Sequence, residues 1–247
     1  MSNIEQTYSQ NATMSVDVPK LLRNTYSLLA CTFVVSAFAA FISTTISNGF
    51  LQQIQADFLD NGQLDTTQGL LSIYQYMGLG FMIPAIALLW FVIPRTANSG
   101  KGIFFTFIFA ALMGAGLGPM LSSYLGAGKG EIIAQALGGT ALIFFGLSAY
   151  ALTTKKDFSY LSGFLMTGGI VLMVAVVANL FLHIPALQIA ISCAFMVFSS
   201  ACILFYTSSA IKGGETNYIM LTVGLYLAIY NLFVSLLSIL GIFGGDD

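Results

Sequence analysis

Long apolar runs alternate with short polar segments along the whole chain. Each run has about twenty residues or more and carries no Asp, Glu, Lys, Arg or His deep inside it. A helix that crosses the hydrocarbon core of a bilayer needs about twenty such residues. The pattern therefore predicts seven membrane-spanning helices, at about residues 25–47, 70–93, 103–125, 132–152, 160–182, 187–211 and 218–243.

The polar segments organise the chain around this seven-helix domain, which we place at residues 24–243. Residues 1–23 contain no apolar core of the signal-peptide type, so we expect an unprocessed N-terminal tail. The other connections are short, which makes successive helices antiparallel neighbours. The exception is the segment 48–69, which we expect to form an acidic outer loop with Asp57, Asp60 and Asp65.

Composition supports a protein buried in lipid. Hydrophobic residues make up 57% of the chain, charged residues only 7%, and the mean hydropathy is +0.88. In a soluble domain roughly a quarter of all residues are charged, so the composition excludes a cytosolic enzyme and a nucleic-acid-binding protein. The predicted fold class is all-α, a polytopic bundle of seven transmembrane helices within a lipid bilayer.

The distribution of Lys and Arg predicts the orientation. Positively charged residues gather in the cytoplasmic loops of membrane proteins. With the N-terminus in the cytoplasm, only Lys129 falls on the outer side. We therefore expect an N-in, C-out protein with a periplasmic C-terminus. The inner segments then hold Lys20, Arg23, Arg95, Lys101, Lys155, Lys156 and Lys212.

The residue pattern gives little support for catalysis or metal binding. The spans lack the ionisable groups that proton pumps and ion-coupled carriers usually need. Ser148 and His183 fall near opposite ends of their spans, roughly 25 Å apart, too far for a catalytic pair. We therefore predict no catalytic residue, no metal site, no cofactor and no enzymatic activity. The three cysteines are expected to be small apolar residues: Cys31, Cys193 and Cys202.

A few small and polar residues within the spans allow two interpretations each. Gly114 and Gly118 precede Pro119, a pattern that favours close helix packing but also suits a gating hinge. Asn231 lies deep in the last span, where it could join helices or form a functional polar centre. The candidates for polar contacts near spans six and seven are Glu215, Asn217 and Asn231.

Several ordered motifs resemble the Bax inhibitor-1 (transmembrane Bax inhibitor motif) family, and more narrowly its bacterial, YccA-like branch. The resemblance covers nearly all of residues 20–241 and is weakest at 48–69. The motifs are KLLRNTY at 20–26, SAYALTTKKD at 148–157, LHIPAL at 182–187, IKGGETNY at 211–218 and YNLFVSLLSILG at 230–241.

The resemblance implies a seven-helix bundle in the bacterial inner membrane, with the last helix at its centre. Members of this branch are described as substrates and modulators of FtsH, a membrane-anchored, ATP- and zinc-dependent protease. It therefore implies an FtsH-type protease complex as partner and a function in restraining the degradation of membrane proteins. The N-terminal tail would engage the protease, and we single out Met1, Glu5, Asp17 and Lys20 there.

Other members of the family are described as calcium-leak channels with a pH sensor of two aspartates, on spans six and seven. The matching positions here are Tyr206 and Ala228, so both carboxylates are missing. Two close carboxylates share a proton and respond to pH, which Tyr and Ala cannot do in that range. The absence favours a protease modulator over the alternative, a calcium or cation leak channel without the sensor.

Overall fold

The computed structural model describes residues 17–61, 77–154 and 156–244, with the backbone alone for residues 57–61. In these residues the regular structure is helical throughout, and no strand occurs. Seven helices within the described part are long and apolar enough to cross a membrane. The predicted all-α fold with seven transmembrane helices is confirmed.

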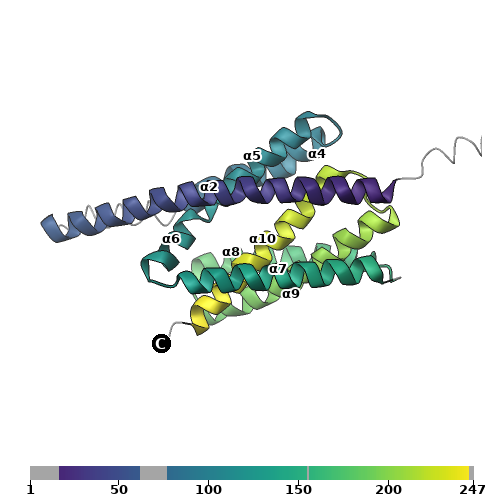
Figure 1. Cartoon of the computed structure of the whole chain (residues 1–247). Helices are drawn as coiled ribbons and strands as arrows, with labels where there is room; N and C mark the ends of the chain where they lie inside the picture. The colour runs from purple at the N-terminus through teal and green to yellow at the C-terminus, as the bar shows by residue number, and fades with distance from the viewer. Residues whose placement is uncertain (1–16, 62–76, 155, 245–247) are drawn as a thin grey trace, which may run out of the picture.

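In Figure 1, α2 and α7 run in nearly the same direction, whereas α5, α6 and α10 run obliquely to them. The second helix includes one π-helical turn, η1, between residues 77–87 and α4. In chain order the elements are α2 (Val18–Asn61), residues 77–87, η1 (Leu88–Val92), α4 (Ile93–Thr96), α5 (Lys101–Gly116), α6 (Gly118–Gly126), α7 (Gly130–Thr153), α8 (Leu161–Leu182), α9 (Pro185–Lys212) and α10 (Tyr218–Phe243).

The helix α2 begins earlier than the apolar pattern suggested. The side chain of Asp17 accepts a hydrogen bond from the backbone N–H of Lys20 at 3.2 Å, and its carbonyl accepts one from Leu21. An aspartate in this position satisfies backbone donors that a helix start leaves unpaired. Lys20 and Arg23 are therefore helical, although we had assigned them to the tail.

At its other end α2 continues past the expected boundary at Ser47 to Asn61. Residues 48–61 are helical, where we had expected the first part of a loop. Polar residues such as glutamine leave the membrane but do not end a helix, and this stretch contains no proline. With 44 residues, α2 is about 66 Å long, roughly twice the hydrocarbon thickness, and it projects beyond the bundle in Figure 1. Asp65 and residues 70–76 lie outside the described residues.

The third span is divided into α5 and α6 at Leu117, two residues before Pro119. Both parts pack closely on α2. A β-carbon added to Gly114 would lie 2.1 Å from the backbone oxygen of Ser36, and one added to Gly118 would lie 2.0 Å from Oγ of Ser43. Only glycine fits at both positions, which supports the interpretation of these residues as a packing surface.

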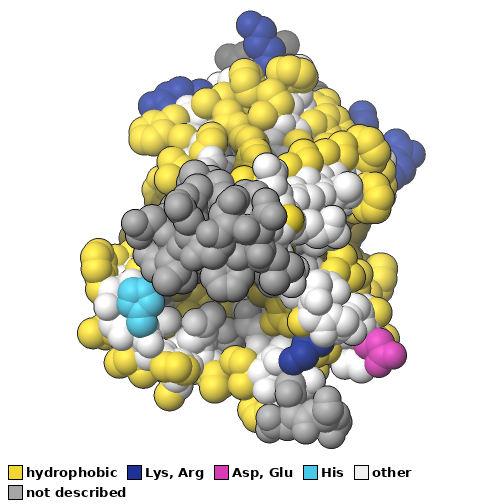
Figure 2. Space-filling view, turned by 90° about the vertical axis from the view of Figure 1, so that its left-hand side faces the viewer, with side chains coloured by type: hydrophobic (Ala, Val, Ile, Leu, Met, Phe, Trp, Pro, Cys, Tyr) yellow, Lys and Arg dark blue, Asp and Glu magenta, His cyan; other side chains and the backbone are white. Residues whose placement is uncertain are grey.

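Helix α10 lies at the centre of the bundle and α8 at its edge. α10 packs against α2, α5, α7 and α9, whereas α8 packs mainly against α9. The core around α10 contains fully buried side chains such as Ile219, Leu225 and Leu232. An end-on view shows hydrophobic side chains around the outside of the molecule (Figure 2). Residues such as Leu142 on α7 and Phe181 on α8 are exposed there, as expected of a surface that faces lipid.

The described charges divide between the two ends of the bundle. Lys129 and Glu131 lie at the end where α7 begins. The opposite end, where α2, α5 and α10 begin, holds the acidic residues Asp17, Asp157 and Glu215 together with most of the basic residues. Its basic residues are Lys20, Arg23, Arg95, Lys101, Lys156 and Lys212.

Candidate functional site

The positions that correspond to the family's sensor aspartates lie where α9 and α10 pack together. The Tyr206 ring lies against Gly224: a β-carbon added to this glycine would be 2.5 Å from the ring atoms Cε1 and Cζ. Ala228, one turn further along α10, is buried with 4% of its surface exposed. An aromatic ring and a methyl group occupy this region, and neither is charged near neutral pH. The contact between α9 and α10 is therefore apolar here.

A hydroxyl network joins α10 to α2 and α5. The hydroxyl groups of Tyr226 and Ser36 form a hydrogen bond of 2.7 Å, and Tyr226 also donates to the carbonyl oxygen of Ala110 at 3.4 Å. The Tyr226 ring stacks on Phe33 and meets Phe109 edge-on, with ring centroids 5.2 and 5.5 Å apart. These contacts fix three helices around one buried tyrosine.

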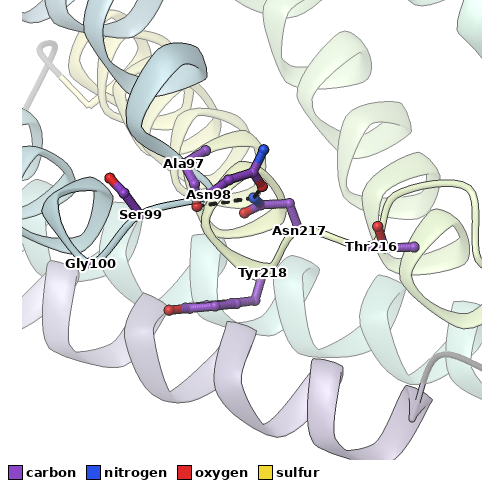
Figure 3. Close-up of a pocket in the computed structure, with 7 residues that line it drawn as sticks. All are labelled: Ala97, Asn98, Ser99, Gly100, Thr216, Asn217 and Tyr218. Carbon is purple, nitrogen blue, oxygen red and sulfur yellow. Dashed lines mark hydrogen bonds between the residues drawn. The ribbon is translucent and has the colours of Figure 1, made fainter. Parts of the chain in front are cut away.

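A second polar junction lies at the start of α10 (Figure 3). The Asn217 side-chain oxygen accepts hydrogen bonds from the backbone N–H groups of Ile219 and Met220, so Asn217 caps the helix. Its amide nitrogen donates to the carbonyl of Ala97 at 3.1 Å and to the side-chain oxygen of Asn98 at 2.8 Å. One side chain thus ties α10 to the turn between α4 and α5.

Glu215 orders the chain just before this junction. One of its carboxylate oxygens accepts hydrogen bonds from the backbone N–H groups of Thr216 and Asn217, each 2.9 Å long. Next to the junction is an open cleft of about 370 Å³, whose lining we show in Figure 3. The lining residues are Ala97, Asn98, Ser99, Gly100, Thr216, Asn217 and Tyr218.

The remaining candidates are placed as follows. Asn231 is half-buried on α10 and makes no hydrogen bond to any residue that the structure describes. Asp17 and Lys20 lie at the start of α2, with Asp17 as its cap. Met1 and Glu5 lie outside the described residues. The structure brings Glu215 and Asn217 together and leaves Asn231 apart from them, further along α10.

Groups with catalytic or metal-binding potential are dispersed in the described part of the chain. No cluster of three or more His, Cys, Asp or Glu side chains suited to a metal ion occurs in that part. Ser148 is buried on α7 near the end where α10 begins, whereas His183 follows α8 at the opposite end. A catalytic serine and histidine need to be within hydrogen-bond reach.

Sequence reasoning missed two residues that turned out to be central to the packing of α2. Ser36 bonds to Tyr226, and Ser43 donates to the carbonyl of Ala115 at 2.7 Å. The two serines are two helical turns apart, on the side of α2 that meets Gly114 and Gly118. The sequence signal for this contact was a pair of serines two helical turns apart in the first span, together with a pair of glycines four residues apart in the third span.

Together, these features define a polytopic α-helical membrane protein with an enclosed last helix and buried hydroxyl contacts between helices. The chain matches the Bax1-I family, described as "Inhibitor of apoptosis-promoting Bax1", over residues 18–245. It belongs to this Bax inhibitor-1 family, as its motifs indicated.

Three relatives are similar to this chain over almost their whole length. "Modulator of FtsH protease YccA" of Escherichia coli K12 is 45% identical over 238 residues, which are 96% of this chain and 97% of that protein. "Inner membrane protein YccA" of Escherichia coli O6:H1 has the same identity and coverage. An uncharacterized protein of Pseudomonas aeruginosa is 44% identical over 98% of this chain and 99% of its own length.

Proposed function

We propose that this protein is an inner-membrane modulator that binds an FtsH-type protease and restrains its degradation of membrane proteins. One observation carries the proposal: 45% identity over 96% of the chain to a relative that is named a modulator of FtsH protease. An alignment of this length extends over the helices of the chain, and therefore over every helix that could contact the protease. The protein acts by binding rather than by catalysis.

The distribution of charge supports an orientation with the N-terminus in the cytoplasm. Most of the described Lys and Arg residues share the end of the bundle at which α2 begins, with Lys129 at the other end. Positive residues favour the cytoplasmic side. The N-terminal tail then faces the side on which a cytosolic ATP-driven protease could engage it.

The packing of α9 on α10 argues against a leak channel with a carboxylate sensor. The Tyr206 ring fills the space beside Gly224, and the neighbouring sensor position is the buried Ala228. A cation passing between these helices would meet no carboxylate at either position. This observation argues against a leak gated by a carboxylate pair, and the identity to a relative named a modulator of FtsH protease favours the modulator over a channel without that sensor.

The proposal is tested by copurification in a gentle detergent with an FtsH-type protease. Residues 1–16 are exchanged for an unrelated polar sequence of equal length, which preserves Asp17 as the cap of α2. We expect the protease to copurify with the unchanged protein and to be lost with the exchanged tail. As a control, the variant Thr45→Ala changes an exposed residue of α2 outside the tail, whose hydroxyl bonds only to the Phe41 carbonyl, and should retain the protease.

Two other outcomes are informative. Copurification that survives the tail exchange would show that the helices make the contact and would contradict the role of the tail. No copurification with the unchanged protein would overturn the proposed function. In that case calcium flux through liposomes that contain the protein would test the channel alternative.

A further inference from the structure

Helix α2 is the first helix after the tail, and it is locked to the third span along one side. We call these contacts the α2 clamp. It consists of Ser36, Ser43 and Asn48 on α2 with Gly114, Ala115, Gly118 and Ser122 on α5 and α6.

The clamp brings two helix backbones into direct contact. The missing side chains of Gly114 and Gly118 leave room for the Ser36 backbone and the Ser43 side chain, which lie 2.1 and 2.0 Å from where the β-carbons would be. Small residues at such a crossing let helices approach closely in lipid. Axial sliding of α2 would force bulkier neighbours into these two places.

Hydrogen bonds reinforce the contact at successive levels. Ser43 donates to the carbonyl of Ala115 at 2.7 Å, and the hydroxyl of Ser122 donates to the side-chain oxygen of Asn48. Position 119 is proline, which has no amide hydrogen to offer to the carbonyl four residues earlier. Ser43 supplies that missing donor. Displacing α2 would leave the Ala115 carbonyl without this donor in a lipid environment, where no water replaces it.

We propose that the α2 clamp slows the extraction of this protein and thereby allows it to restrain the protease. This inference rests on the proposed function. A protease that pulls the tail applies force along α2, because the tail leads directly into this helix. Such a force acts on all contacts of the clamp at the same time, so these contacts must break together rather than one after another. Extraction is therefore slow, and the protease stays occupied with a protein that it withdraws poorly.

The test loosens the clamp without removing its glycines. In the double variant Ser43→Ala/Ser122→Ala both hydroxyls that donate across the clamp are lost, while the backbone fit to Gly114 remains. The matched control is Thr45→Ala: Thr45 is exposed on α2 and bonds only to the Phe41 carbonyl in its own helix. Each full-length protein is placed in liposomes with purified FtsH-type protease, ATP and a labelled second membrane substrate.

We expect the double variant to be degraded about tenfold faster than the unchanged protein, since two interhelical hydrogen bonds of ~0.6 kcal/mol or slightly more each are lost. The second substrate should be protected correspondingly less. Thr45→Ala should behave like the unchanged protein. Pulling the N-terminus of single molecules in a bilayer, without protease, should show a lower extraction force for the double variant alone.

The failures of the two proposals can be distinguished. If all three proteins copurify with the protease but are degraded at equal rates, the inference about the clamp is overturned and the proposed function stands. Faster degradation of the double variant with undiminished protection of the second substrate would also overturn the inference. If no variant binds the protease, the proposed function fails, and the inference fails with it.

Discussion

Helices α8 and α10 are almost equally apolar, yet they occupy opposite places in the bundle. In the most apolar stretch of α10, 50% of the residues are buried inside the protein, against 6% in α8. α10 carries Thr222 and Tyr226, whose hydroxyls bond to other helices. On α8, Thr167 bonds only to carbonyl groups of its own helix.

This difference shows what holds the bundle together. Lipid tails solvate an apolar side chain as well as another helix does, so hydrophobicity alone gives a helix no reason to be central. Close packing at glycine and hydrogen bonds between helices supply the preference. α10 has both at Gly224 and Tyr226, whereas Gly163 on α8 has open space beside it.

The largest effect that separates the two helices is expected from glycine substitution. Gly224→Ala places a methyl group about 2.5 Å from the Tyr206 ring, which must move. We expect the free energy of unfolding to fall by about 3 kcal/mol, measured by titration of the purified protein with SDS. Gly163→Ala on α8 should change it by no more than about 0.5 kcal/mol.

A double-mutant cycle identifies the cause of that loss. If the clash with Tyr206 is responsible, Gly224→Ala should cost little in a Tyr206→Ala background. Equal costs in both backgrounds would contradict the packing argument. Equal costs for Gly224→Ala and Gly163→Ala would remove the distinction between a central and a peripheral helix.

The next effect concerns the starts of the two helices. Asn217→Ala removes the cap of α10 and the bonds to Ala97 and Asn98, so we expect a loss of about 2 kcal/mol in the same titration. Asn217→Asp keeps the cap and should recover part of that loss. α8 has no side-chain cap at Tyr160, so Tyr160→Ala should be nearly neutral. A comparable loss at Tyr160 would argue against the cap as the cause.

The smallest effect is expected from single hydroxyl groups. Tyr226→Phe removes the bond to Ser36 and the longer bond to the Ala110 carbonyl and keeps the ring contacts, with an expected loss of about 0.6–1 kcal/mol. Thr167→Val on α8 removes a hydroxyl that bonds within its own helix and should have almost no effect. The bond between Ser36 and Tyr226 predicts that Ser36→Ala and Tyr226→Phe together cost less than the sum of the two. Strict additivity would contradict this coupling.

Much of the secondary structure could be read from hydropathy. The last five helices lie within two residues of the ranges expected from the sequence, and α10 has the expected bounds, Tyr218–Phe243. Apolar runs of membrane length leave the chain few alternatives to helices, since lipid satisfies no backbone hydrogen bond. The ends of α2 were less accessible, because a helix does not stop where its sequence becomes polar.

The polar contacts were only partly predictable. Asn217 was singled out by type and position, and its capping role fits an asparagine just before an apolar run. The bond between Ser36 and Tyr226 joins residues 190 positions apart, and no local pattern pairs them.

The class of protein, the presence of seven helices and the family can be inferred from the amino-acid sequence, because they follow from hydropathy, length and ordered motifs. The enclosed position of α10, the edge position of α8 and the hydrogen bond by which Ser43 replaces the amide missing at Pro119 are visible only in the packed bundle. Hydropathy measures the transfer of a helix into lipid, which is similar for all seven helices. The place of each helix depends on contacts between residues far apart in the chain, and these exist only once the helices have packed.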